Sequence, residues 1–316
     1  MSEVLTLGMD LGGTQARTAL VRGGEIVRRL AEPTDTEGGP DAILGQFRRM
    51  AAELRAGTER AAIVGAGICT PGPLDTETGT TLHIPTLPGW EDFPVRERMA
   101  EALSLPVVVE NDGTAATFGE WRYGAGQGKR HVLYVTVSTG IGGGAVVDGV
   151  LLHGHRGMAT HMGHFRMAPD GPVCACGATA CFEALAAGTA FAKRARAAAT
   201  APGGHLGAVA AARRVETRDV VEGAQAGDPA CLALIAEEAA LLGQGFTGLM
   251  HLFSPELLIM GGGVSNAFDL LEDGIRAVVR RDAMPPFREV PIVRARLGDN
   301  AGLIGAATLA LEKGDG

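Results

Sequence analysis

One pattern occurs twice along this chain of 316 residues: an apolar run, a glycine-rich turn, a second apolar run, and a short turn into a third. The first copy spans residues 4–30 and turns at residues 12–14. The second spans residues 131–152 and turns at residues 140–144. Apolar runs separated by glycine turns predict antiparallel strands. Strand-like and helix-like segments follow each copy, so we expect an α/β protein of two similar domains around a cleft.

The remaining segments alternate between the two kinds of secondary structure. Short apolar runs bounded by Gly or Pro predict strands, and apolar residues three and four apart predict helices. The first domain is assigned to residues 1–117 and the second to residues 118–299, with a C-terminal helix at about 300–316 that packs back on the first domain. Further strands are expected at residues 62–69, 105–110, 256–260 and 290–295, and helices at residues 39–54, 91–103, 114–123, 183–199, 228–253, 267–281 and 302–313.

Charge and hydropathy exclude several classes of protein. The formal net charge is −8, so the basic surface that nucleic-acid binding needs is not expected. Arginine pairs such as Arg213–Arg214 are interpreted as solvated surface. The first residues show no signal-peptide pattern, and no apolar run approaches the roughly 20 residues that cross a bilayer. We therefore expect a soluble cytoplasmic protein with neither a nucleic-acid nor a membrane partner.

Three of the five cysteines lie within eight residues, at Cys174, Cys176 and Cys181, and His164 precedes them. Three thiolates and one imidazole are typical of a closed, four-coordinate structural zinc site. Pro and Gly between these residues favour a loop in which the sulfurs converge. The competing interpretation is a disulfide between Cys174 and Cys181, which would leave Cys176 unpaired. The other two cysteines lie in apolar segments and are expected to be buried thiols.

The first glycine turn is a candidate phosphate site. Glycines let backbone amides approach an anion closely, and Thr14 adds a hydroxyl donor beside Gly12 and Gly13. Asp10, at the end of the preceding strand, is a candidate to orient Mg²⁺ or its water shell. The competing interpretation is a plain hairpin with a polar residue at its end.

The second turn and a third glycine cluster extend the phosphate hypothesis to a nucleotide. Thr139 and Gly140 open the second turn, and two such turns facing each other would clamp a triphosphate. Gly261, Gly262 and Gly263 follow a predicted strand and are candidates to lie beneath an adenosine, although a tight strand-to-helix turn is the simpler interpretation of them alone. A dinucleotide-binding fold is disfavoured, because no Gly-x-Gly-x-x-Gly motif opens a helix.

Asp112 is the candidate general base. Phosphoryl transfer needs a group that accepts the proton of the attacking hydroxyl. Asp112 follows a predicted strand at the start of a helix, where a carboxylate is well placed for that role. The competing interpretation is that Asp112 only caps the helix. Asn111 beside it can hydrogen-bond a polyol.

The residues around the cysteine cluster are candidates to bind a sugar. His161, His164 and Glu183 frame the cluster and could supply donors and acceptors to sugar hydroxyls. His153 and His155 are interpreted as exposed loop residues.

Together these motifs resemble the ROK family of sugar kinases, within the actin/hexokinase/Hsp70-like superfamily, over essentially the whole chain. The resemblance implies two ribonuclease-H-like domains of the actin/hexokinase type with a zinc-braced loop, and a homodimer or dimer of dimers. It rests on the first phosphate motif at residues 10–14, the catalytic motif at 110–112, the second phosphate motif at 138–144, the adenosine motif at 261–265, and the zinc pattern of His164 with the three cysteines.

The resemblance also implies an activity. ATP and Mg²⁺ are implied as cofactors for phosphorylation of a hexose, most simply glucose to glucose 6-phosphate, with Asp112 as the base. Asn111, Asp112, His164 and Glu183 are implied to contact the sugar, with the other ring nitrogen of His164 on a structural Zn²⁺.

One departure from the family pattern bears on the sugar. The family usually has Glu-x-Gly-His before the cysteines, and this chain has His161 in place of the Glu. A neutral imidazole donates one hydrogen bond and accepts one, whereas a carboxylate only accepts. The sugar hydroxyls read at this position should therefore differ. Ala180 in place of a usual Gly, and Gly113-Thr114 in place of Ala-Asn, are smaller departures.

Several functions compete with a glucokinase. A kinase for N-acetylmannosamine, fructose or allose retains every motif. A non-catalytic sugar sensor is disfavoured by the presence of Asp10 and Asp112. Regulators in the family carry an added N-terminal helix-turn-helix, for which the first strand leaves no room. A polyphosphate-dependent kinase is disfavoured because the adenosine motif is intact and no basic stripe is evident.

Overall fold

The computed structural model describes residues 4–58, 62–84, 87–199 and 204–314. The last two residues of the predicted C-terminal helix lie outside this range. The chain divides into two compact units, Met1–Arg130 with Gly143–Thr160 and Arg296–Gly316, and His131–Gly142 with His161–Ala295. The division at residue 117 that we expect from the sequence stays a prediction.

A five-stranded sheet of order β3-β2-β1-β4-β7 forms the centre of the first unit. The first three strands are the predicted glycine-tipped hairpin and its continuation, and they pair antiparallel. The next two strands run parallel to β1, because helical connections separate them from it. The bounds are β1 Leu5–Leu11, β2 Gln15–Arg22, β3 Glu25–Pro33, β4 Ile63–Thr70 and β7 Val107–Asn111.

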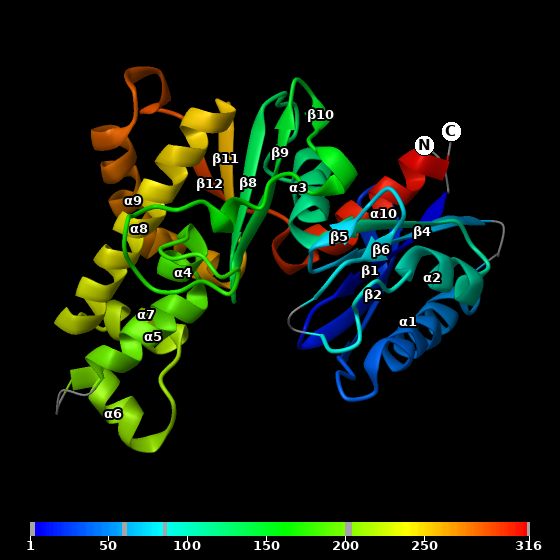
Figure 1. The fold of residues 1–316 in the computed structure, drawn as a ribbon, viewed down its shortest axis with the longest axis horizontal. Coiled ribbons are helices and arrows are strands. Elements are labelled where there is room, and N and C mark those ends of the chain that lie inside the picture. The colour runs from blue at the N-terminus through cyan, green and yellow to red at the C-terminus, as the bar shows by residue number, and fades with distance from the viewer. Residues whose placement is uncertain (1–3, 59–61, 85–86, 200–203, 315–316) are drawn as a thin grey trace. The chain divides into compact units, whose positions relative to one another are not determined.

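Helices cover both faces of this sheet (Figure 1). Leu7 and Met9 on one face of β1 pack in a core with Phe47 of α1. On the other face α10 lies so close that a Cβ on Gly67 would be 1.8 Å from the carbonyl oxygen of Ala306, so only glycine fits there. The helices are α1 Gly39–Arg55, α2 Val95–Leu103, α3 Asp112–Tyr123 and α10 Ala301–Gly314.

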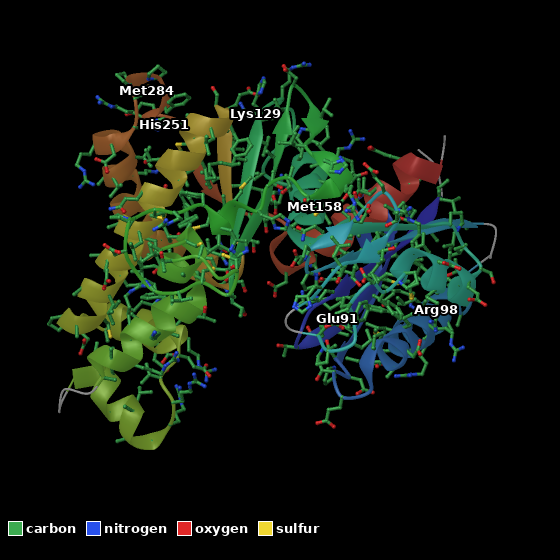
Figure 2. The ribbon with its side chains drawn as sticks, in the orientation of Figure 1. Glu91, Arg98, Lys129, Met158, His251 and Met284 are labelled. Atoms are coloured by element: carbon green, nitrogen blue, oxygen red, sulfur yellow. The ribbon has the colours of Figure 1, made fainter. Side chains whose placement is uncertain are left out.

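Smaller elements complete the first unit. A two-stranded hairpin pairs β5 Leu74–Asp75 with β6 Thr80–Thr81. Arg98 on α2, labelled in Figure 2, lies over the Phe93 ring, with its guanidinium carbon 5.6 Å from the ring centre. Two 3₁₀ turns also belong to this unit, η2 His155–Gly157 and η6 Gly298–Asn300.

A second five-stranded sheet has the order β10-β9-β8-β11-β12. The turn between β8 and β9 lies at residues 138–140, whereas Gly142, Gly143 and Gly144, predicted to belong to the turn, form part of β9. Strand β11 pairs parallel with both β8 and β12. The boundary between the two units falls within β9, after Gly142. The strands are β8 Val132–Val137, β9 Ile141–Val147, β10 Val150–Leu151, β11 Leu257–Gly261 and β12 Ile292–Arg294.

The helices of the second unit depart from the predicted ones in two places. The single helix expected over residues 183–199 breaks at Ala187, whose ψ of 158° is extended. Two helices between residues 204 and 225 are not among the predicted ones. The elements are α4 Phe182–Ala186, α5 Gly188–Ala198, α6 Gly204–Ala212, α7 Thr217–Gln225, α8 Pro229–Phe253 and α9 Phe268–Asp282, with 3₁₀ turns η3 Met162–His164, η4 Gly263–Ala267 and η5 Pro285–Phe287.

Within the described residues, α8 alone is long and apolar enough to cross a membrane by length and composition. Its most apolar window has a mean hydropathy of 1.2, and 56% of that window is buried inside the protein. It also carries Glu237 and Glu238, and the fully buried Glu238 is ion-paired with Arg194. Burial raises the pKa of Glu238 to about 8. These features are those of a core helix.

Candidate functional site

The sheet of the first unit brings the two candidate carboxylates to one edge. Strands β1, β4 and β7 are parallel, with Asp10 paired to Cys69 and Cys69 paired to Glu110. Neighbouring strands lie about 4.8 Å apart, so the ends of β1 and β7 are roughly 10 Å apart. Asp112, directly after β7, therefore shares this edge with Asp10.

Asp112 is the first residue of α3, but it is not the cap of that helix. The side-chain oxygen of Asn111 accepts from the amides of Gly113, at 3.0 Å, and Thr114, at 3.3 Å, so Asn111 is the N-cap. The interpretation of Asp112 as only a helix cap is wrong. Because Asn111 satisfies the helix start, the Asp112 carboxylate, which accepts from the Gly113 amide at 2.8 Å, retains free acceptor positions for a substrate.

The surroundings of Asp112 adjust its basicity. Desolvation by nearby protein raises the pKa of Asp112 to about 6, the hydrogen bond from Gly113 opposes this, and the like charge of Asp10 adds to it. The side chain is nevertheless exposed at the surface, so solvent and a ligand can reach the carboxylate although many protein atoms surround it. A carboxylate with a pKa near neutrality has the proton affinity that suits a general base.

Asp10 is held by two side chains. Arg17 donates to one carboxylate oxygen at 3.3 Å, and the thiol of Cys69 donates to the other at 3.5 Å. Desolvation raises the pKa of Asp10, while the charge of Arg17 opposes the shift. Cys69 is fully buried, as predicted, and its own pKa is well above the usual range through burial and the charges of Asp10 and Asp112.

The first glycine turn leaves donors available. Gly12 donates its amide to the Gln15 carbonyl at 3.1 Å, and its carbonyl accepts from the Thr34 hydroxyl at 2.6 Å. Gly13 and Thr14 at the tip are exposed. Among the described residues no acceptor is recorded for their amides, which is the arrangement that a phosphate-binding turn requires.

A pocket of about 670 Å³ lies wholly within the second unit. It is of the size that holds small ligands and cofactors. It brings together the start of the second glycine turn and the third glycine cluster, two motifs that are more than 120 residues apart in the sequence. Its wall is formed by Ser138, Thr139, Gly188, Thr189, Ala192, Arg196, Arg214, Glu216, Thr217, Arg218, Val221, Glu222, Gly263, Val264, Asn266 and Ala267.

In the third glycine cluster, Gly262 cannot be replaced without strain, whereas Gly263 has open space beside it. Gly262 has φ +81°, and a Cβ there would be 2.4 Å from the carbonyl oxygen of Val137. Gly263 lines the pocket and is exposed, and a Cβ there would meet only the Ser138 hydroxyl, at 3.8 Å. The backbone thus passes beside the pocket with no side chain in the way.

Several residues of the pocket wall were not expected from the sequence. Thr189 donates its hydroxyl to the carbonyl of Thr139 at 2.8 Å and so ties α5 to the glycine turn. The Arg213–Arg214 pair is not simply solvated surface, because Arg213 is paired with the buried Asp219 and Arg214 lines the pocket. Three arginines and two glutamates at the wall give it a mixed charge.

The cysteine cluster forms a set of four converging metal ligands. One ligand atom from each of His164, Cys174, Cys176 and Cys181 lies within 4.8 Å of the other three. The Cys176 and Cys181 sulfurs are 3.6 Å apart, and the Cys174 sulfur is 3.6 Å from Nδ1 of His164. Sulfurs on a tetrahedral zinc with bonds of about 2.3 Å are roughly 3.8 Å apart, so the cluster fits such an ion. The thiols are free, and the structure shows no Cys174–Cys181 disulfide.

Glu183 connects this cluster to the second glycine turn. One carboxylate oxygen accepts from the Ile141 amide at 2.9 Å, and the other lies 3.7 Å from the Cys174 sulfur. His161, which immediately precedes η3, and His164, its last residue, are exposed, with ring centres 6.3 Å apart. His161, His164 and Glu183 therefore form one polar group on the second unit.

The backbone under this group is tightly packed at Gly163. A Cβ there would lie 2.2 Å from the carbonyl oxygen of Ile141, which cannot move without displacing β9. We expect Gly163→Ala to lower the free energy of unfolding by about 1–3 kcal/mol, as in other overpacked sites. Gly248→Ala on α8, whose Cβ would meet only the Phe165 ring at 3.6 Å, should leave stability unchanged or raise it. Thermal denaturation of both variants measures the difference, and equal midpoints would contradict the packing argument.

Comparison with known proteins places this chain in a family. The model of the ROK family matches residues 6–313. The chain belongs to the ROK family. Its ROK relatives include a glucokinase of Streptomyces coelicolor, 37% identical over 98% of both chains, and an N-acetylmannosamine kinase of Yersinia pestis, 31% identical over 96% of this chain and 97% of the relative.

The fold agrees with that of ROK enzymes. The structure of a ROK family glucokinase from Streptomyces griseus in complex with glucose and AMPPNP covers 98% of this chain and 99% of its own, with a TM-score of 0.86 and 34% sequence identity. The predicted α/β class is thereby confirmed.

Proposed function

We propose that this ATP-dependent sugar kinase of the ROK family transfers the γ-phosphoryl group of ATP to a hexose hydroxyl, with glucose as the first candidate and Asp112 as the general base. The observation that carries the proposal is Asp112 itself, an exposed carboxylate at the end of β7 with a pKa of about 6. Its position is one that the cap at Asn111 leaves free for a substrate.

Asp112 would accept the proton of the attacking hydroxyl as that oxygen bonds to the γ-phosphorus. Phosphoryl transfer depends mainly on positioning and on neutralising charge, so the base need only orient the hydroxyl and take its proton. The side-chain NH2 group of Asn111 has no acceptor among the described residues and would donate to a neighbouring sugar hydroxyl. The two adjacent residues would thus orient the same sugar.

The pocket of the second unit is our candidate for the adenosine, because its wall includes Thr139 and Gly263. Their sequence neighbours Gly140, Gly261 and Gly262 would complete the nucleotide site. The tip of the first glycine turn, with Gly12, Gly13 and Thr14, would bind phosphate oxygens through its amides. Magnesium, when bound, neutralises charge on the phosphates. Asp10 is the residue of this chain that would hold the ion or its water.

The four-ligand cluster would hold a structural zinc. Zinc with four protein ligands has no open position, so its contribution is to fix a loop. With Nδ1 of His164 facing the sulfurs, Nε2 of the same ring points to other partners and would bind the sugar. Glu183, tied to the Ile141 amide, would present a carboxylate to the same hydroxyls. A homodimer or dimer of dimers in the cytoplasm remains our expectation.

The identity of the sugar would depend on position 161, where this chain has His in place of the usual Glu. Glucokinases at up to 37% identity support glucose, and the N-acetylmannosamine kinase at 31% supports an N-acetylated hexose as the second candidate. ADP release with ATP, Mg²⁺ and a panel of sugars tests the proposal directly. Turnover that rises strongly when one sugar is added supports the proposal, and an equal rate without sugar would contradict it. No turnover with any sugar would leave a sensor as the better interpretation.

His161 is expected to decide between sugars. In His161→Glu, a residue that only accepts replaces one that also donates. We expect the ratio of kcat/KM between glucose and N-acetylmannosamine to change by about tenfold or more, because leaving one polar group unpaired costs about 1–3 kcal/mol. His155→Glu adds the same charge at an exposed position of the first unit and serves as the control. An unchanged ratio in His161→Glu would remove this residue from the sugar site.

Gly263→Val tests the nucleotide pocket. The space at Gly263 is open, so the fold should accept the new side chain, while the methyl groups occupy the pocket. We expect KM for ATP to rise by about tenfold or more, equivalent to about 1.4 kcal/mol, with an unchanged melting temperature and an unchanged KM for the sugar. Wild-type affinity for ATP in this variant would place the adenosine elsewhere.

A further inference from the structure

His153 lies against the catalytic motif of the first unit, although it is distant from it in the sequence. Its Nε2 is 3.0 Å from a carboxylate oxygen of Glu110, the residue before Asn111 and Asp112. Glu110 is 1% exposed, so this carboxylate is withdrawn from water and depends on protein partners. The interpretation of His153 as an exposed loop residue is therefore wrong, whereas His155 is exposed as expected.

The second oxygen of Glu110 reaches the catalytic motif directly. It accepts from the backbone amide of Asn111 at 2.9 Å. Asn111 in turn fixes the start of α3 through the amides of Gly113 and Thr114. A continuous series of hydrogen bonds thus runs from the His153 ring through the Glu110 carboxylate to the peptide that carries Asn111 and Asp112.

The buried Glu110 carboxylate is held at one oxygen by His153 and at the other by the Asn111 amide, so its rotation is restricted. Since the Glu110 oxygens accept, the Nε2–H of His153 donates. Removing that donor would leave a buried acceptor unpaired, and the carboxylate would turn or recruit water to compensate. A turn of the carboxylate moves the acceptor of the Asn111 amide, and a mobile water at the other oxygen would restrain it less than the His153 ring does. A shift of about 1 Å at reacting groups is enough to lower a rate substantially.

The segment that carries His153 has a second anchor. Arg156 donates to Asp75 at 2.7 Å, and its carbonyl accepts from the Thr76 amide at 3.1 Å. Asp75 is buried, and the hydrogen bond from Arg156 holds its pKa below the usual range. Met158, labelled in Figure 2, marks the same segment, just before the chain reaches His161. The two contacts of this segment differ. Glu110, the partner of His153, is hydrogen-bonded to the backbone amide of Asn111, whereas Asp75, the partner of Arg156, is not.

We propose that His153 is a positioning residue for sugar phosphorylation, which acts through Glu110 to hold Asn111 and Asp112 in their reactive orientation. The inference rests on the proposed function, since it assigns to Asp112 the role of base. His153 touches neither substrate in this scheme. Its effect is on the orientation of two residues that do.

The test compares variants of the full-length enzyme in steady-state kinetics, with melting temperatures measured in parallel. His153→Ala removes the donor, and His153→Gln restores an N–H at a similar reach. Arg156→Gln weakens the other anchor of the segment, and His155→Ala is the matched histidine control. For His153→Ala we expect kcat/KM for the sugar to fall by about tenfold or more, with KM for ATP within about twofold of the wild type, because the candidate ATP pocket lies in the other unit.

The remaining variants separate positioning from mere anchoring. His153→Gln should recover most of the lost rate, and Arg156→Gln should lower the melting temperature without a comparable loss of kcat. In Glu110→Gln, the added loss from His153→Ala should be small, because both changes interrupt the same series of bonds. Equal losses of kcat in Arg156→Gln and His153→Ala, or full additivity with Glu110→Gln, would overturn the proposal.

Two outcomes keep this inference distinct from the proposed function. A wild-type enzyme that phosphorylates no sugar would refute the proposed function. An active wild type with a folded His153→Ala of unchanged kcat/KM would refute the inference alone. If His153→Ala does not fold, His153→Gln and Glu110→Gln decide, since a wild-type KM and kcat in Glu110→Gln would overturn the role of the carboxylate.

Discussion

Asp112→Asn is expected to lower kcat for sugar phosphorylation by about 10³-fold, within the range that general acid–base catalysis contributes. The amide matches the carboxylate in shape, and its oxygen can still accept from the Gly113 amide that is 2.8 Å away in the wild type. What it loses is the ability to take a proton. The measurement is ADP release under saturating sugar and ATP.

Binding and folding should survive this substitution. Because Asn111, not Asp112, caps α3, the helix keeps its start and the melting temperature should stay close to that of the wild type. Sugar affinity, measured by calorimetry, should change little beside the change in kcat. A variant with more than about a tenth of the wild-type kcat would exclude Asp112 as the base.

The pH dependence of the wild type follows from the same residue. The base must be ionised, and the pKa of Asp112 is raised to about 6, so kcat/KM should rise with pH through about 6 and level off above it. The like charge of Asp10 contributes to that shift. Asp10→Asn should therefore move the ascending limb to lower pH, in addition to any effect on magnesium. A profile that is flat between pH 5 and 7 would contradict the assignment.

Cys176→Ser is expected to reduce zinc from about one ion per chain to nearly none and to destabilise the loop that carries His161 and His164. Cys176 is exposed, so its sulfur contributes little by packing, and serine has almost the same shape. Without a metal the change should be nearly neutral, as for other surface substitutions. With a metal it removes one of four ligands, and the melting temperature should fall by at least about 5 °C.

The control for this experiment is Cys231→Ser, a buried thiol on α8 that does not belong to the cluster. It should keep its zinc even if the loss of a buried sulfur lowers its stability. Metal analysis and thermal denaturation of both variants, with and without a chelator, distinguish the two effects. Zinc-free protein with wild-type stability and full activity would refute the bracing role.

The strands and the first glycine turn were predictable, because their signals are local. The second turn was placed too late, because Gly142, Gly143 and Gly144 suggest a turn but lie in β9. Alternating apolar runs and glycines identify β1 to β3 and β8 to β10 within a few residues of their bounds. The helix over residues 183–199 fails because the alanine-rich sequence on both sides of Ala187 favours helix, and Gly188 is the only local sign of the break. There the amide of Gly188 donates to the carbonyl of Ser138. The helix α7 begins with a capping box in which Glu216 takes the position usual for Ser or Thr, and Asp219 the position usual for Glu or Gln. The usual capping-box sequence is therefore missing.

The candidate site was predictable to the extent that its residues cluster in the sequence. His164 and the three cysteines lie within eighteen residues of one another, and the structure brings their ligand atoms together. His153 and the pocket wall were missed for the opposite reason. The partner of His153 is 43 residues away. Thr189 on α5 and Arg214, between α6 and α7, meet in the pocket wall only once the chain has folded. Such contacts leave no periodic pattern to detect.

The boundary between the two units has a consequence for engineering. The chain passes from one unit to the other after Arg130, Gly142, Thr160 and Ala295. Neither unit is therefore encoded by an uninterrupted stretch of gene, and no single truncation isolates either unit. Recombination that exchanges the larger part of the second unit between relatives would need paired crossovers around residues 161–295 rather than one joint. A point substitution, such as the one proposed at His161, avoids this requirement.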